Sequence, residues 1–254
     1  MTARADRPNL SPFFAALFTA VGLYLPYFPL WLAWKGLDAA TIGLVLTAPM
    51  VVRLLAMPFL GAFADRFARP AVPLRLFALA ATGAFALLFL ADGPIAIAAA
   101  VAVAGAFWGA LVPVSDAIAV RLSRAGGPDY GRVRIAGSAA FIAANLGGGA
   151  LLSVVTDAAV LPLVAAAFAG TLAASLALGI PPGIATGGAE TPAAAGATRR
   201  FLLVAVAAGL VQASHGLVYA FGSIWWEGRG FSPTAIGALW ATGVVAEIVL
   251  FRFG

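Results

Sequence analysis

Two ionisable residues stand in the interior of long apolar stretches of the sequence. Arg53 lies twelve residues beyond Thr41, which at 1.5 Å per residue places it near the middle of a helix over residues 40–63. Glu247 occupies the equivalent depth in a second apolar stretch, residues 234–253. A charge at the centre of a membrane costs ~2.5 to 3.5 kcal/mol, so both are expected to face protein or water. We expect Arg53 to bind an anionic group and Glu247 to carry a coupling proton; a structural ion pair between them is the alternative.

Further polar and aromatic residues recur at helical spacing. Gln212, His215 and Tyr219 share one face of a helix. His215 is the only histidine, a residue type that suits either proton exchange at physiological pH or a hydrogen bond with a neighbouring helix. Tyr24 and Tyr27 form a similar face, which predicts contact with a substrate ring or an aromatic belt at the membrane surface.

Two more polar residues interrupt apolar stretches. Asp116 stands five residues before Arg121, at about 8 Å from the basic end of its helix by helical rise. We expect Asp116 to form an inner gate or a salt bridge with Arg132 or Arg134, and a proton carrier is the alternative. Asn145 is expected to line a cavity or to bond across helices.

The elements that position these residues are membrane-spanning helices. Apolar residues make up 63% of the chain and charged residues only 10%, and the mean hydropathy is +1.02. The core of one soluble domain cannot bury so many apolar residues. A bilayer core needs ~20 apolar residues per helix. The sequence predicts an all-α polytopic membrane protein whose spans are residues 10–32, 40–63, 72–91, 94–120, 133–155, 159–179, 201–225 and 234–253.

The distribution of basic residues predicts the orientation of these spans. Short cytoplasmic loops are rich in Lys and Arg, and only Lys35 and Arg229 fall on the side opposite to the N-terminus. We therefore expect a multi-pass protein of the cell (cytoplasmic) membrane with a cytoplasmic N-terminus. The arginines are dispersed over separate loops, so the net charge of +5 reflects topology and no nucleic-acid partner is expected.

The sequence favours no catalytic or cofactor chemistry. The absence of cysteine excludes thiolate metal sites and a cysteine nucleophile. The only lysine, Lys35, falls in a loop and not in a span, so a buried Schiff base is excluded. We expect no enzyme activity, no cofactor and no metal.

A weak internal repeat divides the chain. Gly36, Ile42, Gly43 and Val51 recur 194 residues later as Gly230, Ile236, Gly237 and Val245, and the same register sets Arg53 opposite Glu247. A repeat of this length in an apolar chain is typical of transporters built from two related halves. Residues 1–180 are predicted to form a six-helix half, 181–200 a Gly-, Ala- and Pro-rich cytoplasmic linker, and 201–254 the first two helices of a second half.

The predicted loop between the second and third spans carries a motif. It reads Gly61-Ala-Phe-Ala-Asp65-Arg66-Phe-Ala-Arg69 and resembles the major facilitator signature of glycine, three residues, aspartate, a base, two residues and a further base. Pro70 stands where that signature usually has another base. Asp65 can cap a helix start or pair with an arginine. The resemblance implies a gating role for Gly61, Asp65, Arg66 and Arg69.

Longer stretches resemble the phenylpropionate permease branch of that superfamily, which is related to the lactose permease group. These are residues 130–138, 214–219 and 245–247. The resemblance implies a twelve-helix proton symporter for small organic acids, sugars or nucleosides, of which this chain holds eight helices. A second copy of the loop signature would then follow near residue 255.

The sequence therefore predicts a secondary transporter that works by alternating access. Its partners are a small organic solute, with an aromatic or other organic acid favoured, protons and the lipid bilayer. Substrate contact is expected from Arg53, Tyr24, Tyr27, Gln212, Tyr219 and Asn145, and proton coupling from Glu247, His215 and Asp116. The alternatives are a truncated, non-transporting membrane binding or assembly protein, and a facilitator for sugars, nucleosides or drugs.

Overall fold

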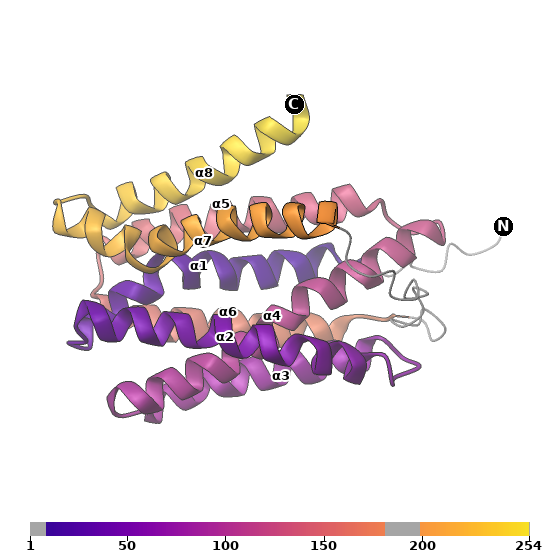
Figure 1. Cartoon of the computed structure of the whole chain (residues 1–254), viewed down its shortest axis with the longest axis horizontal. Helices are drawn as coiled ribbons and strands as arrows, with labels where there is room; N and C mark the ends of the chain where they lie inside the picture. Colours follow the sequence, from indigo (N-terminus) through magenta and orange to yellow (C-terminus); the bar gives the residue numbers. More distant parts are fainter. Residues whose placement is uncertain (1–8, 181–198, 254) are drawn as a thin grey trace.

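The computed structural model describes residues 9–180 and 199–253, and they form a bundle of long helices (Figure 1). The all-α prediction is confirmed. Two short 3₁₀ turns, η1 (Leu88–Leu90) and η2 (Asp157–Ala159), accompany the longer helices. The α-helices are α1 (Ser11–Trp34), α2 (Ala39–Ala64), α3 (Ala71–Leu87), α4 (Gly93–Arg124), α5 (Tyr130–Leu152), α6 (Val160–Ala177), α7 (Arg199–Gly228) and α8 (Pro233–Phe253).

These helices have the length and composition of membrane spans. Seven of them, counted over the described residues, are long and apolar enough to cross a bilayer, and the apolar described part of α8 is Pro233–Ala246. Their bounds lie within three residues of the predicted spans, except that α4 runs four residues further at its C-terminal end and α3 ends four residues earlier, where η1 follows. Residues 181–198, nearly all of the predicted linker, lie outside the described residues.

The helices α2 and α8 begin in the same way, at the positions that the repeat pairs. Gly36 and Gly230 precede them with φ of 82° and 86°, a left-handed conformation that glycine adopts without steric cost. Asp38 then accepts a hydrogen bond from the amide nitrogen of Thr41 at 2.8 Å, and Ser232 accepts one from the amide three residues beyond it at 3.2 Å. Both are N-caps that satisfy a free amide of the first helical turn. The two segments thus share a local structure as well as a sequence pattern.

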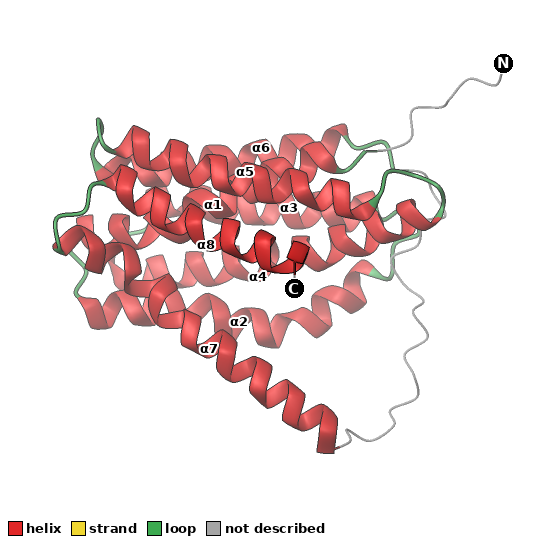
Figure 2. Ribbon diagram, turned by 90° about the horizontal axis from the view of Figure 1, so that it is seen from above, coloured by secondary structure: helices red, strands yellow, loops and turns green. Residues whose placement is uncertain are grey.

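The helix α1 forms the centre of the bundle. It packs against α5 and α6, while α3 and α4 pack together and α2 lies along α4. The other two helices reach this group separately, because α7 contacts α1 and α8 contacts α5 far more than they contact each other. Figure 2 shows α7 leaving the bundle towards its N-terminal end, where residues 199–211 are exposed.

Small residues permit the closest helix approaches. A Cβ on Gly148 would lie 2.7 Å from the Tyr27 ring, and one on Gly237 would overlap the backbone oxygen of Asn145. Such faces let helix backbones pack at short distance in a membrane. The α1, α5 and α8 helices therefore meet tightly near the α8 N-terminus.

Candidate functional site

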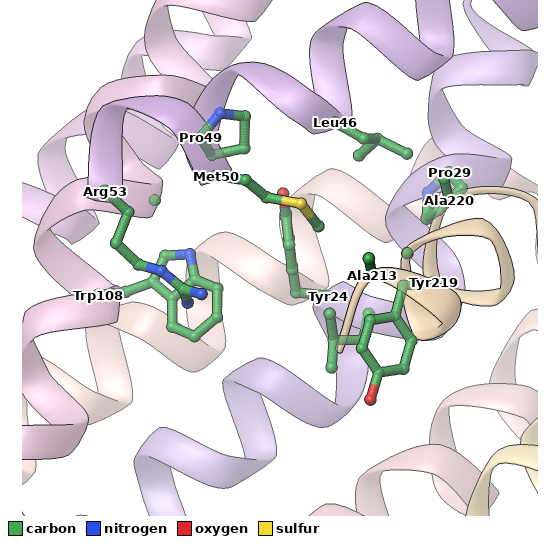
Figure 3. Close-up of a pocket in the computed structure, with 13 residues that line it drawn as sticks. Tyr24, Pro29, Leu46, Pro49, Met50, Arg53, Trp108, Ala213, Tyr219 and Ala220 are labelled. Carbon is green, nitrogen blue, oxygen red and sulfur yellow. The ribbon is translucent and has the colours of Figure 1, made fainter. Parts of the chain in front are cut away.

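A cavity of about 450 Å³ lies between α1, α2, α4 and α7. Its walls are mainly apolar or aromatic, with Leu46 and Met50 from α2, Tyr24 from α1 and Tyr219 from α7 (Figure 3). Arg53 is the only charged residue among the described residues that line it. Pockets of this size with few polar groups are typical of small-molecule sites.

The guanidinium of Arg53 is held against an aromatic ring. Arg53 follows Pro49 and Met50 on the cavity face of α2, and its Cζ lies 6.0 Å from the centre of the Trp108 ring. This is the outer limit of a cation–π contact. The side chain remains exposed, so its N–H groups are accessible to a planar anion such as a carboxylate.

Two tyrosines supply further aromatic walls. The Tyr24 ring lies 6.0 Å from the Trp108 ring at an interplanar angle of 60°, and the Tyr219 ring stacks on Trp240 of α8 at 5.5 Å. Both tyrosines line the cavity. Their faces suit a ring-bearing solute.

His215 lies one turn from Tyr219 but does not line the cavity. Its Nδ1 is 2.7 Å from the backbone oxygen of Val211 on the same helix, and its ring is tilted at 5.8 Å from that of Tyr219. The side chain is exposed. The structure therefore places His215 beside the site and not in its wall.

Tyr27 and Asn145 belong to a different place. The Tyr27 hydroxyl donates a hydrogen bond to the backbone oxygen of Asn145, within the junction of α1, α5 and α8. The Asn145 side chain is fully buried, and neither its oxygen nor its nitrogen is hydrogen-bonded to a described residue. Neither residue lines the cavity.

Two predicted site residues cannot be placed by their side chains. Gln212 stands within α7 and Glu247 within α8, but both side chains lie outside the described residues. The two predictions stay open at this point.

Asp116 belongs to a cluster near the C-terminal end of α4. The Tyr130 hydroxyl donates to Asp116 Oδ1 at 3.1 Å, and Arg134 is close enough to interact electrostatically with this carboxylate. The Arg134 guanidinium in turn lies over the Phe18 ring, 4.2 Å from its centre. Of the two arginines expected near Asp116, the structure brings Arg134 to it, and Phe18 adds a contact from α1.

The signature loop connects α2 and α3 at the surface. Gly61, Asp65, Arg66 and Arg69 are all exposed. Asp65 is the C-cap residue of α2, and α3 begins after Pro70 without a side-chain cap. The expected capping of a helix start by Asp65 is therefore wrong for this structure, because Pro70 occupies the N-cap position of α3.

Sequence reasoning missed Trp108, which forms part of the cavity wall and faces Arg53. A signal was present, because Trp108 falls in the middle of the predicted span 94–120, whereas membrane tryptophans are enriched near the interfaces. Met50 was missed for lack of any such signal.

Comparisons with known proteins agree on one family. A family model described as the MFS_1 like family matches residues 8–254. The chain is 33% identical over 245 residues to a "Probable 3-phenylpropionic acid transporter" from Escherichia coli (strain K12), covering 92% of this chain and 63% of that protein. It is 32% identical over 145 residues to a maltose permease from Geobacillus stearothermophilus, covering 56% of this chain and 36% of the permease.

A solved structure shows the same fold. The nucleoside transporter NupG superimposes with a TM-score of 0.79 at 18% identity, over 96% of this chain and 65% of NupG. The chain therefore spans less than two thirds of the length of each of these transporters.

Proposed function

This chain belongs to the MFS_1 like family of major facilitator transporters, and from that premise we propose that it is part of a proton-coupled symporter for a small organic acid. Membership and the apolar helices make it a multi-pass membrane protein of the transporter type, not an enzyme. An aromatic acid is the favoured substrate. The relative whose printed name includes 3-phenylpropionic acid supports this choice.

The residues that line the cavity support an organic acid as the substrate. Arg53 is the only charge among the described residues that line the cavity, and Tyr24, Trp108 and Tyr219 add aromatic surface to its walls. A carboxylate pairs with the guanidinium through charge-assisted hydrogen bonds, while a phenyl ring contacts the tyrosines. A neutral ligand would leave the guanidinium unpaired in an apolar wall.

Alternating access is proposed to act between a six-helix half, residues 1–180, and a second half that begins with α7 and α8, joined through the cytoplasmic linker 181–200. The contacts of α8 with α5 near Gly149 and Gly237 and the departure of the α7 N-terminal end (Figure 2) support a bundle closed at one end. With a cytoplasmic N-terminus, the closed end faces outward. Gly61, Asp65, Arg66 and Arg69 act as the inner gating loop in this proposal.

Proton coupling is assigned to Glu247, with His215 and Asp116 as further candidates. The assignment of Glu247 is supported by the repeat, which pairs it with Arg53. The hydrogen bond between Asp116 and Tyr130 supports a role of Asp116 as a proton carrier or gating residue near the cytoplasmic side. In this proposal, protonation of the glutamate removes a negative charge at the position that the repeat pairs with Arg53, and so links substrate release to proton transfer. Gln212 stays a proposed polar contact of the transport path, whereas Tyr27 and Asn145 do not line the cavity and are assigned to the packing of α1 on α5.

The test uses the protein expressed from its intact gene in proteoliposomes. We expect accumulation of labelled 3-phenylpropionate when the outside is acidic, and loss of accumulation when a protonophore is added. Arg53→Ala abolishes uptake, Arg53→Lys retains part of it because the charge remains, and Glu247→Gln keeps exchange but loses gradient-driven accumulation. Unchanged uptake by Arg53→Ala would remove Arg53 from the substrate site.

The second candidate is a facilitator for sugars or nucleosides. The similarity to a maltose permease favours it, because aromatic side chains also contact sugar rings. Competition by maltose or uridine, and no competition by 3-phenylpropionate, would select this alternative. Absence of uptake of every solute, with ligand binding retained, would favour a non-transporting binding protein.

A further inference from the structure

Gly109 lies on the face of α4 that receives α2, directly against the methylene stem of Arg53. A Cβ on Gly109 would overlap Arg53 Cδ, and it would lie 3.1 Å from Cγ and 3.5 Å from Nε. Because Gly109 has no side chain, the methylene stem of Arg53 can lie along α4. The preceding residue, Trp108, receives the guanidinium at 6.0 Å. Two consecutive residues of α4 thus hold the two ends of one side chain.

A second glycine of α4 makes a useful contrast. A Cβ on Gly105 would overlap the Pro49 Cβ and lie 3.3 Å from the Pro49 Cα. Pro49 and Gly105 stand four residues before Arg53 and Gly109, so the two contacts are one helical turn apart along the same packing face. An added methyl group at Gly105 meets atoms fixed to the α2 backbone. At Gly109 it meets a flexible side chain that is exposed to the cavity.

We propose that Gly109 is a positioning residue of the anion site: it seats the Arg53 stem so that the guanidinium lies over Trp108 and faces the cavity. This inference rests on the proposed function of Arg53 as the partner of a substrate carboxylate. Gly109 touches no substrate itself. It acts by determining which rotamers of Arg53 are free of steric overlap.

The two glycines therefore differ in the effect of the same substitution. Gly109→Ala displaces the Arg53 side chain and leaves the helix packing intact, so it lowers affinity for a carboxylate without lowering thermal stability. Gly105→Ala forces α2 and α4 apart and lowers stability. A neutral analogue that does not use the guanidinium binds Gly109→Ala and the natural protein equally.

The experiment is a double-mutant cycle in the protein expressed from its intact gene. Binding of 3-phenylpropionate and of its neutral amide is measured at pH 7 in detergent for the natural protein, Gly109→Ala, Arg53→Ala and the double variant. We expect Gly109→Ala to weaken carboxylate binding roughly tenfold, a factor equivalent to about 1.4 kcal/mol. In the Arg53→Ala background the same substitution has no further effect, because the stem is absent. Gly83→Ala, where a Cβ meets nothing within 4 Å, is the matched control.

The outcomes separate the positioning role of Gly109 from the proposed function of Arg53. Equal losses from Gly109→Ala in both backgrounds, or no loss in either, overturn the positioning role. If Arg53→Ala itself leaves carboxylate binding unchanged, the proposed function of Arg53 fails first. If Gly109→Ala does not fold, the Arg53→Ala background restores folding when the stem is the cause of the overlap, and failure to fold in both backgrounds overturns the proposal.

Discussion

At the scale of single residues, Tyr24 and Tyr27 show how one face of a helix serves two purposes. The two tyrosines stand three residues apart on α1, about 60° apart around the helix axis. Tyr24 lines the cavity and contacts the rings of Phe85 and Trp108. Tyr27 turns instead to α5 and donates its hydroxyl hydrogen to Asn145. The three-residue spacing does not predict this division, because the division depends on which neighbouring helix each ring meets.

The Tyr27 hydroxyl is therefore predicted to stabilise the fold and not to bind substrate. Tyr27→Phe should lower the free energy of unfolding by about 0.6 kcal/mol, the average for a hydrogen bond between membrane helices. Unfolding of the detergent-solubilised protein in increasing denaturant measures this change. The control is Tyr24→Phe, whose hydroxyl is bonded to none of the described residues. A larger loss of stability in Tyr24→Phe would contradict the assignment.

At the scale of elements, the starts of α2 and α8 differ in one chemical respect. Asp38 caps α2 with a carboxylate and Ser232 caps α8 with a hydroxyl. The hydrogen bond from the Thr41 amide lowers the pKa of Asp38. A carboxyl whose pKa is lower in the folded state stabilises that state above its unfolded pKa of about 3.9, and this contribution is lost as the pH falls through the folded value.

The α2 cap is accordingly predicted to be sensitive to pH. Asp38→Ala should lower the melting temperature at pH 7, and the difference from the natural protein should shrink as the pH falls below about 4. Ser232→Ala should lower it by an amount that does not depend on pH, because a hydroxyl does not titrate in this range. Melting curves of both variants at pH 7 and at acidic pH measure the effect. If the melting-temperature difference between Asp38→Ala and the natural protein stays constant with pH, the Asp38 carboxylate is not the group that stabilises the start of α2.

The contact between α8 and α5 depends on a glycine. Because a Cβ on Gly237 would overlap the backbone oxygen of Asn145, Gly237→Ala should cost about 1 to 3 kcal/mol by overpacking. Gly243→Ala, on the same helix but with nothing within 4 Å of its Cβ, should have little effect. Thermal stability of the two variants in detergent provides the comparison. Equal stability would show that α8 does not pack on α5 as described.

At the scale of the whole molecule, the cavity is predicted to open to the cytoplasm. The 254 residues contain no cysteine, so a thiol introduced among them reports alone in an otherwise cysteine-free background. Ala213→Cys, at a cavity-lining position on α7, should react with a membrane-impermeant maleimide from the cytoplasmic face, and 3-phenylpropionate should slow the reaction. Lys35→Cys, in the α1–α2 loop, should react only from the outside. Reversed sidedness of both sites would invert the proposed topology.

The sequence by itself determined the membrane class, the helix bounds and the repeat that pairs the starts of α2 and α8. These features follow from local chemistry: the length of apolar stretches, and a glycine and a capping residue at set positions. The tertiary structure alone decided which side chains share the cavity. Trp108 and Gly109 face Arg53, while Tyr27 and Asn145 pack elsewhere, because helix rotation is determined by the fit of one helix surface to another. That fit involves residues more than fifty positions apart in the sequence, which no local pattern records.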